Sequence, residues 1–155
     1  MSPTTDTANT ADAQAQCLAE RVRDAMLADD HASRMLGMRV TAVGPGRAVL
    51  QMTVRQNMLN GHAICHGGLI TTLADSSFAF ACNSYNEQTV ASGFTVDLLA
   101  PGRLGDVLTA SCTELAKGGR TGVYDVEVSN QRGERIAIFR GRSHTARGKP
   151  VVAAG

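Results

Sequence analysis

The sequence predicts an α+β domain in which a curved antiparallel sheet wraps around one long central helix. Two features of the chain predict this fold. The run from Gly67 to about Tyr85 is the only long helical stretch, and it is apolar nearly all round, as in a helix that other structure surrounds. After Asn86 the pattern changes to strand-like runs separated by turn residues, which is typical of an antiparallel sheet.

The strands are predicted from apolar runs that lie between turns. Before the helix, the turn Gly44-Pro45-Gly46 separates two runs that should form a hairpin. After the helix, the turns are Pro101-Gly102, Gly118-Gly119 and Gln131-Arg132-Gly133. The expected strands are residues 35–43, 47–54, 89–99, 106–117, 121–130 and 134–147.

One domain is expected. The chain has 155 residues, of which 43% are apolar and 19% charged, so it is able to bury a core. Residues 1–15 are mostly small and polar and are predicted to form a disordered N-terminal tail. The domain should span residues 16–147 and begin with a short amphipathic helix from Cys17 to Met26, and residues 148–155 should form a C-terminal tail.

Charge and composition exclude several classes of partner. A formal net charge of +1 gives no broad basic field, so neither nucleic acid nor a membrane surface is an expected partner. No apolar run approaches the ~20 residues that cross a bilayer. The first residues lack the profile of an export signal, and the four cysteines show no paired or zinc-like spacing. A cytoplasmic location is therefore expected.

The most informative segment is NGHAICHGG, from Asn60 to Gly68, directly before the central helix. The double glycine lets the backbone approach a ligand closely, and a helix that begins there presents free N–H groups and the positive end of its dipole. This arrangement suits an oxyanion hole for a thioester or carboxylate oxygen, with His66 adding polar groups and Asn60 orienting water or the carbonyl. The alternative is that Gly67 and Gly68 merely mark a helix start.

Asp75 is the one acid in the apolar helix. Burial raises the pKa of a carboxyl group and makes it a competent base, whereas the alternative is a structural aspartate bonded to threonine or backbone. Asp75 and Gly67 would stand ~12 Å apart on one helix. Because a base must come within ~3 Å of the water it activates, the acid should come from a second copy of the chain. A two-fold dimer with antiparallel central helices would supply it twice.

A metal site is not expected. His62 and His66 are four residues apart and flank Cys65, but they lie in a loop and no fourth ligand is spaced nearby. Cys65 is interpreted as a packing residue, because adjacent side chains in extended chain point to opposite sides. Phe78 and Phe94 are interpreted as core residues.

Five segments in order give the chain a resemblance to hotdog-fold acyl-CoA thioesterases, of the phenylacetyl-CoA type (PaaI type) of bacterial phenylacetate degradation. The resemblance covers roughly Met35 to His144 and rests on NGHxxCHGG, LADSSFAFACNSYN, TVDLLAPG, GVYDVEVSNQ and FRGRSH. It implies a hotdog fold, assembled as dimers and often tetramers.

The resemblance also implies roles for single residues. The catalytic aspartate of the family falls on Asp75, and the backbone N–H that polarises the thioester falls on Gly67. The family's asparagine corresponds to Asn60, its histidine before the double glycine to His66, and the hydroxyl residue that helps to hold water to Thr95. The implied reaction is hydrolysis of phenylacetyl-CoA or hydroxylated aryl-acetyl-CoA to free acid and CoA, without a metal or redox cofactor.

Coenzyme A carries a diphosphate and a 3′-phosphate, so cationic donors are needed near the site. Arg140, Arg142 and His144 alternate along one predicted strand and should share one face. Arg120 and the backbone of Gly68 complete the predicted substrate-binding set. The alternative is a solvated edge strand whose charges deter aggregation.

Two other functions stay open. A hydratase or dehydratase on the same fold would move a proton with a histidine and an acid, and His62 and His66 are available for this. A non-catalytic acyl-CoA sensor would need an attached reader, for which only the short segment from Cys17 to Met26 is available.

Overall fold

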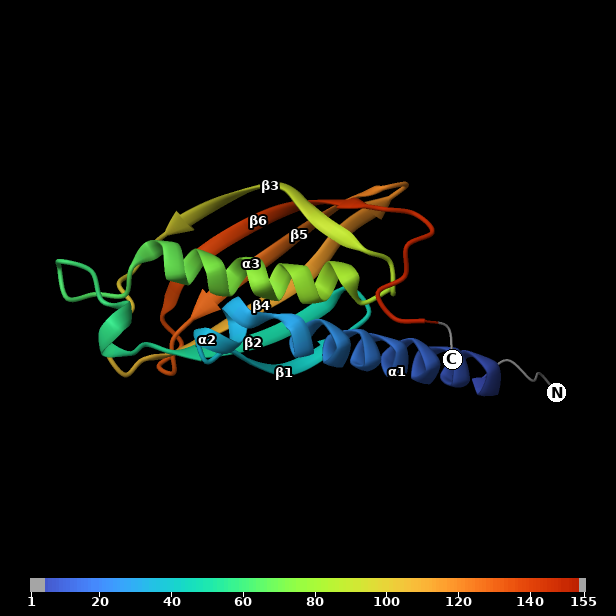
Figure 1. Cartoon of the computed structure of the whole chain (residues 1–155), viewed down its shortest axis with the longest axis horizontal. Helices are drawn as coiled ribbons and strands as arrows, with labels where there is room; N and C mark the ends of the chain where they lie inside the picture. Colours follow the sequence, from blue (N-terminus) through green and yellow to red (C-terminus); the bar gives the residue numbers. More distant parts are fainter. Residues whose placement is uncertain (1–4, 154–155) are drawn as a thin grey trace.

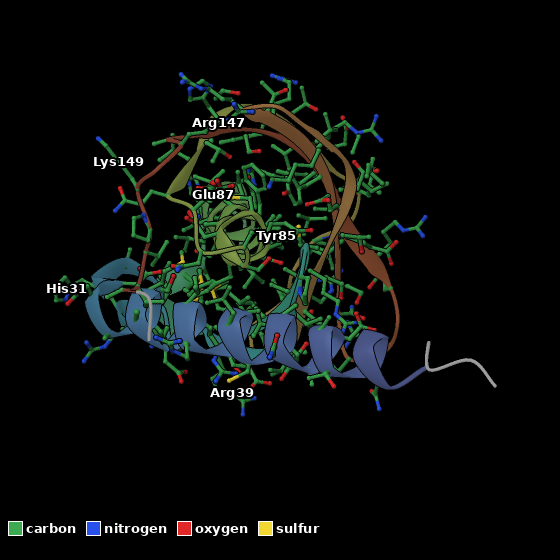
Figure 2. All side chains as sticks on the ribbon, turned by 90° about the vertical axis from the view of Figure 1, so that its right-hand side faces the viewer. His31, Arg39, Tyr85, Glu87, Arg147 and Lys149 are labelled. Carbon is green, nitrogen blue, oxygen red and sulfur yellow. The ribbon has the colours of Figure 1, made fainter. Side chains whose placement is uncertain are left out.

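The structure is a computed structural model that describes residues 5–153. Six antiparallel strands form one sheet in the order β1-β2-β4-β5-β6-β3, and the sheet curls around the helix α3 (Figures 1 and 2). The helices are α1 (Thr5–Asp29), α2 (His31–Met35), the 3₁₀ turn η1 (Gln56–Met58) and α3 (Gly67–Asn83). The strands are β1 (Arg39–Gly44), β2 (Arg47–Thr53), β3 (Thr89–Leu98), β4 (Val107–Gly118), β5 (Thr121–Ser129) and β6 (Arg135–Thr145). The predicted α+β fold with one central helix is confirmed.

Helix α3 is held in the sheet by one buried face. Leu73, Phe78 and Ala81 on that face are at most 1% exposed. The hydroxyl of Ser77, which is also buried, donates to the carbonyls of Ala48 on β2 and Ala110 on β4, so the polar group costs little in the core. The opposite face carries small polar residues that are only partly buried: Thr71, Thr72, Asp75 and Ser76. The Ser76 hydroxyl lies 3.1 Å from the Ser33 hydroxyl of α2, so α2 covers one part of this stripe.

Aromatic rings fill the centre between α3 and the sheet. The ring centroid of Phe78 lies 5.3 Å from that of Tyr124 and 5.9 Å from that of Phe139, both tilted. Gly141 on β6 makes room for this cluster, because a Cβ atom there would stand 2.9 Å from the Phe78 ring. Phe78 is therefore a core residue, as predicted. Phe94, on the inner side of β3, stacks on Phe139 with the two ring centroids 4.8 Å apart, yet its side chain remains 41% exposed.

The N-terminal helix is longer than predicted. Residues 5–15 belong to α1, so the expectation of a disordered segment through residue 15 is wrong for this stretch. Alanine-rich sequence has high helix propensity, and once Ala19 and Val22 are buried the helix extends at low cost beyond the packed turns. At the other terminus, Asn86 receives the N–H groups of Val151 and Val152, which fixes the segment after β6 against the end of α3.

The two edges of the sheet differ. Helix α1 packs along β1, and the Gln16 side-chain amide donates to the carbonyl of Val43 at 2.8 Å, which blocks that edge. Strand β3, at the opposite edge, is paired with β6 alone among the described strands. Val90, Phe94 and Leu98 on β3 are 65%, 41% and 52% exposed. This chain therefore leaves one apolar edge open.

Candidate active site

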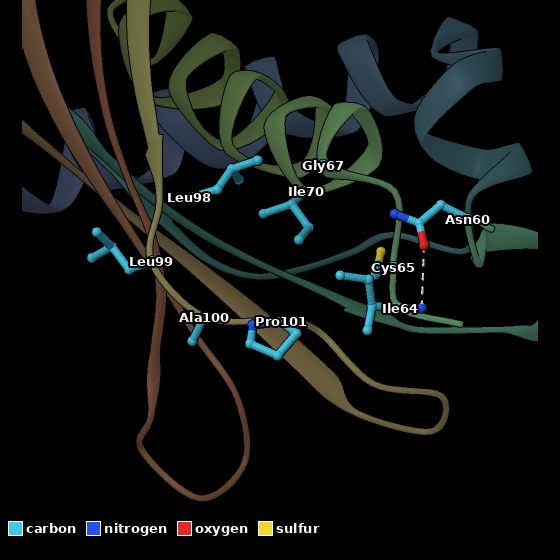
Figure 3. A pocket seen from close by; sticks show the side chains of 9 residues that line it. All are labelled: Asn60, Ile64, Cys65, Gly67, Ile70, Leu98, Leu99, Ala100 and Pro101. Carbon is cyan, nitrogen blue, oxygen red and sulfur yellow. Dashed lines mark hydrogen bonds between the residues drawn. The ribbon is translucent and has the colours of Figure 1, made fainter. Parts of the chain in front are cut away.

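A pocket of about 410 Å³ lies at the N-terminal end of α3 (Figure 3). Its walls come from the loop before α3, the first turn of α3 and the segment that follows β3. The lining residues are Asn60, Ile64, Cys65, Gly67, Ile70, Leu98, Leu99, Ala100 and Pro101. Most of them are aliphatic, so the pocket suits an apolar group, while Asn60 and the Gly67 backbone are the polar groups at its mouth.

Asn60 shapes the loop that forms one wall. Its side-chain oxygen accepts hydrogen bonds from the backbone N–H groups of His62 at 2.9 Å and Ile64 at 3.4 Å. The backbone N–H of Asn60 donates to the Ile64 carbonyl. These bonds close a tight turn in which Ala63 has a positive φ of 57°. The oxygen is therefore occupied, whereas the amide nitrogen points toward the start of α3 (Figure 3). Asn60 is placed to donate a hydrogen bond into the pocket.

His66 caps the helix rather than entering the pocket. It is the N-cap of α3, and its Nδ1 accepts the N–H of Gly68 at 3.0 Å. An accepting Nδ1 places the ring proton of a neutral imidazole on Nε2. The Gly68 N–H therefore already has an acceptor within the chain. Among residues 5–153, no acceptor receives the Gly67 N–H, so this amide is the free donor at the positive end of the helix dipole.

Asp75 lies on the partly buried stripe of α3, two turns beyond Gly67, and it does not line the pocket of its own chain. Burial raises the pKa of its carboxyl group. No hydrogen bond or ion pair from another described residue reaches this carboxylate. The nearby threonines bond elsewhere, because Thr71 donates to the Gly67 carbonyl and Thr72 to the Gly68 carbonyl. A structural partner for Asp75 is therefore absent from the described part of the chain.

Thr95 lies on the outer face of the sheet. Phe94 beside it points inward onto Phe139, so the alternation along β3 turns Thr95 away from α3. Its side chain borders a separate hollow of about 240 Å³, together with Asp125 and Arg140. The structure does not bring Thr95 together with Gly67 or Asn60.

The predicted cationic residues share this outer face. Arg140, Arg142 and His144 alternate on β6 and are exposed, as expected from their spacing. Arg140 is not free, because its guanidinium binds both carboxylate oxygens of Asp125 at 2.6 and 2.7 Å. These hydrogen bonds lower the pKa of Asp125. Arg120 lies in the β4–β5 turn and is also exposed.

An acid that the sequence analysis missed anchors the far wall. Asp106 is 3% exposed; burial alone would raise its pKa, but hydrogen bonds from Arg132, the Arg103 N–H and Gln131 lower it to about 2. The turn that it holds includes Gly102, whose carbonyl accepts the Cys65 N–H at 2.8 Å. The sequence signal that could have indicated this role is the pair of predicted turns, at Pro101-Gly102 and at Gln131-Arg132-Gly133. Both turns lie at the same end of the sheet, and Asp106 bonds to residues near both of them.

Cys65 is 2% exposed, and burial raises the pKa of its thiol, which fits the packing role predicted for it. Within residues 5–153, no three histidine, cysteine, aspartate or glutamate side chains are grouped as metal ligands. In the same described part of the chain, every helix is too short or too polar to cross a membrane.

Comparisons with known proteins match this fold. The family model of the thioesterase superfamily matches residues 62–137. Acyl-coenzyme A thioesterase PaaI of Escherichia coli K12 is 48% identical over 120 residues, which are 77% of this chain and 86% of the relative.

Two solved structures extend the likeness. The E. coli PaaI protein from the phenylacetic acid degradation operon superimposes with a TM-score of 0.85 and 44% identity, over 86% of this chain and 97% of that chain. The smu.793 protein of Streptococcus mutans, bound to acetyl CoA, superimposes with a TM-score of 0.68 and 26% identity, over 70% of this chain and 88% of that chain. The chain therefore belongs to the thioesterase superfamily, and its curved sheet around α3 is the hotdog fold of these structures.

Proposed function

We propose that the protein hydrolyses acyl-CoA thioesters to a free acid and CoA, with phenylacetyl-CoA or a ring-hydroxylated aryl-acetyl-CoA as substrate. The free Gly67 N–H at the mouth of an apolar pocket is the observation that supports this most strongly. The E. coli relative is named an acyl-CoA thioesterase, and its structure is that of a protein from the phenylacetic acid degradation operon. This likeness supports an aryl-acetyl group as the acyl part of the substrate. The reaction needs water and side chains of the protein; CoA is part of the substrate.

The proposed step begins with the thioester carbonyl in the pocket mouth. Its oxygen accepts the Gly67 N–H, with the Asn60 amide nitrogen as a second donor, and both stabilise the negative charge that develops on that oxygen. Asp75 takes a proton from water while the water oxygen bonds to the carbonyl carbon. The C–S bond then breaks, and the thiolate of CoA receives the proton from Asp75. In the direct alternative, the Asp75 carboxylate bonds to the carbonyl carbon, the C–S bond breaks, and CoA leaves as its thiolate. Water then attacks the Asp75 carbonyl of the resulting anhydride, which releases the free acid and the Asp75 carboxylate, and a proton from that water goes to the thiolate.

Asp75 must come from a second copy in this proposal. Pairing β3 of one copy with β3 of another would extend the sheet, cover Val90 and Phe94, and lay the two α3 helices antiparallel. The small, polar stripe of α3 permits close approach of the helices. Each Asp75 would then stand near Gly67 of the other chain. Association of two dimers into a tetramer is the further expectation from the family.

The CoA phosphates are proposed to bind the exposed cations of the outer face. Arg142 and His144 have no carboxylate partner among the described residues, whereas Arg140 is shared with Asp125, so Arg142 is the stronger candidate. Arg120 lies at the same end of the sheet. Thr95 remains a candidate for holding water only from this outer face. The cytoplasm is the proposed location, since all four cysteines are free.

A substrate panel tests the proposal. Thiol release is measured with phenylacetyl-CoA, its ring-hydroxylated forms, benzoyl-CoA and straight-chain thioesters, for the wild type and Asp75→Asn. We expect release to be fastest with the aryl-acetyl substrates and to be lost in the variant. Hydration of an enoyl-CoA with its thioester intact would instead establish the hydratase. Tight binding of acyl-CoA without turnover would establish a sensor.

Single turnover in ¹⁸O-labelled water separates the two forms of the step. If Asp75 acts as a base, the label enters the acid product directly. If Asp75 attacks the carbonyl, the label appears first in the Asp75 carboxylate, and mass spectrometry of the peptide detects it.

A further inference from the structure

Leu98 lies against the backbone that carries the free amide of the site. A Cβ atom built on Gly67 would stand 2.5 Å from Leu98 Cδ1 and meets no other side chain within 4 Å. Gly67 does not have a positive φ, so its backbone conformation does not require glycine. The glycine instead provides room for the Leu98 methyl group. Figure 3 shows Leu98 reaching from β3 toward the first turn of α3.

Leu98 has no core role that would explain this position. It is the last residue of β3 and 52% exposed, whereas a core leucine such as Leu73 is fully buried. Its exposed methyl groups line the pocket beside Ile70 and Gly67. The Leu98 side chain therefore forms the part of the pocket wall that lies next to Gly67, where the carbonyl would bind.

We propose that Leu98 determines which acyl groups are accepted by limiting substitution at the carbon next to the thioester carbonyl. The inference rests on the proposed function. A carbonyl oxygen bound to the Gly67 N–H lies ~2.9 Å from that nitrogen, so the carbonyl carbon and its neighbour occupy the space directly in front of the first helical turn. Leu98 Cδ1 lies beside the same residue, 2.5 Å from the position of a Cβ atom on Gly67. A methylene group fits there, and a further methyl branch on the same carbon meets the leucine.

Leu99 provides a matched control. It lines the same pocket and is 54% exposed, close to the 52% of Leu98, but it makes no close approach to Gly67. Truncating either residue to alanine removes the same atoms from a half-exposed pocket wall. Only Leu98→Ala removes them from beside Gly67.

The test compares kcat/KM for phenylacetyl-CoA and 2-phenylpropanoyl-CoA, which carries the extra methyl branch. We expect the wild type to prefer the unbranched substrate at least about tenfold, Leu98→Ala to reduce that preference about tenfold, and Leu99→Ala to leave the ratio unchanged. An unchanged ratio in Leu98→Ala, or an equal change in Leu99→Ala, overturns the inference. If the wild type hydrolyses phenylacetyl-CoA and the ratio does not respond, this inference alone fails; if no thioester is cleaved, the proposed function fails too.

A second pair of variants tests the contact itself. Gly67→Ala keeps the amide N–H but pushes a methyl group into Leu98, so we expect it to lower kcat/KM for both substrates. The double variant Gly67→Ala/Leu98→Ala should recover activity, because the displaced side chain is gone. Full activity in Gly67→Ala, or no recovery in the double variant while thermal unfolding stays normal, contradicts the placement of Leu98 over the amide.

Discussion

Gly67 begins α3 and Asp75 lies eight residues further along the same helix, so a rise of about 1.5 Å per residue keeps their Cα atoms about 12 Å apart. Gly67 offers the free amide, and Asp75 carries the carboxyl whose pKa is raised by burial. A single chain cannot bring both groups to one carbonyl. The open edge of β3 offers the route by which a second chain would complete the site.

Asp75→Asn should lower kcat at least about a hundredfold, because the variant cannot take a proton from water. It should also stabilise the fold at neutral pH. Burial raises the pKa of Asp75 in the folded state above its ordinary value, so ionising it disfavours folding once the pH exceeds the folded pKa. The melting temperature of the variant should therefore exceed that of the wild type at pH 7.5, on the order of 2 °C, and the difference should shrink toward pH 4. A variant that melts lower at pH 7.5 and still releases thiol contradicts both roles.

Gly67→Pro/Leu98→Ala removes the amide hydrogen that the site needs, and the Leu98→Ala change makes room for the Cβ atom that proline brings. Gly67 is the first helical residue, where proline is well tolerated, and His66 has a ψ of 128° that suits the residue before a proline. We expect a folded protein whose kcat falls about 10²–10³-fold, the usual cost of one lost oxyanion donor. Gly67→Ala/Leu98→Ala, which keeps the N–H, serves as its control. Near-normal kcat in Gly67→Pro/Leu98→Ala rules out this amide as the oxyanion donor.

Phe94→Glu should prevent dimer formation. Phe94 is 41% exposed on the open edge strand, and two-fold pairing would bring two like charges to the same dry surface. We expect monomers by light scattering and loss of thiol release. Leu115→Glu, at 52% exposed on β4, is the control that should stay dimeric and active. An active monomer would show that one chain suffices.

Arg142→Ala should raise KM several-fold for an acyl-CoA but not for the same acyl group on pantetheine, which lacks the nucleotide phosphates. The effect should weaken at high salt, as expected of an exposed charge. Arg140→Ala should change KM less, because Asp125 already binds that guanidinium. Equal effects on both thioesters would show that Arg142 does not contact the phosphates.

The fold was predictable where local pattern decides it. Apolar residues all round α3 and the glycine turns between strands gave the central helix and the antiparallel sheet. The start of α1 was not predictable from residues 5–15 alone, because packing further along the helix at Ala19 and Val22 anchors it.

The site was predictable where its residues are close in sequence. Asn60 and Gly67 lie seven residues apart and line one pocket. The placement of Thr95 depends on which face of β3 turns toward α3. Because apolar residues of β3 are also exposed, the pattern of apolar and polar residues does not show which face is buried. The Arg140–Asp125 pair depends on the register of β5 against β6, which no local pattern gives.

Subunit complementation tests the central claim most directly. Asp75→Asn and Gly67→Pro/Leu98→Ala are each purified, mixed in equal amounts, and allowed to exchange subunits. Random exchange makes half of the dimers mixed, and each mixed dimer holds one site with both an intact Asp75 and an intact Gly67. We predict that thiol release rises from near zero to about a quarter of the wild-type rate per chain. If the mixture stays as inactive as its components although mass spectrometry detects mixed dimers, the two residues act within one chain and the shared site is contradicted.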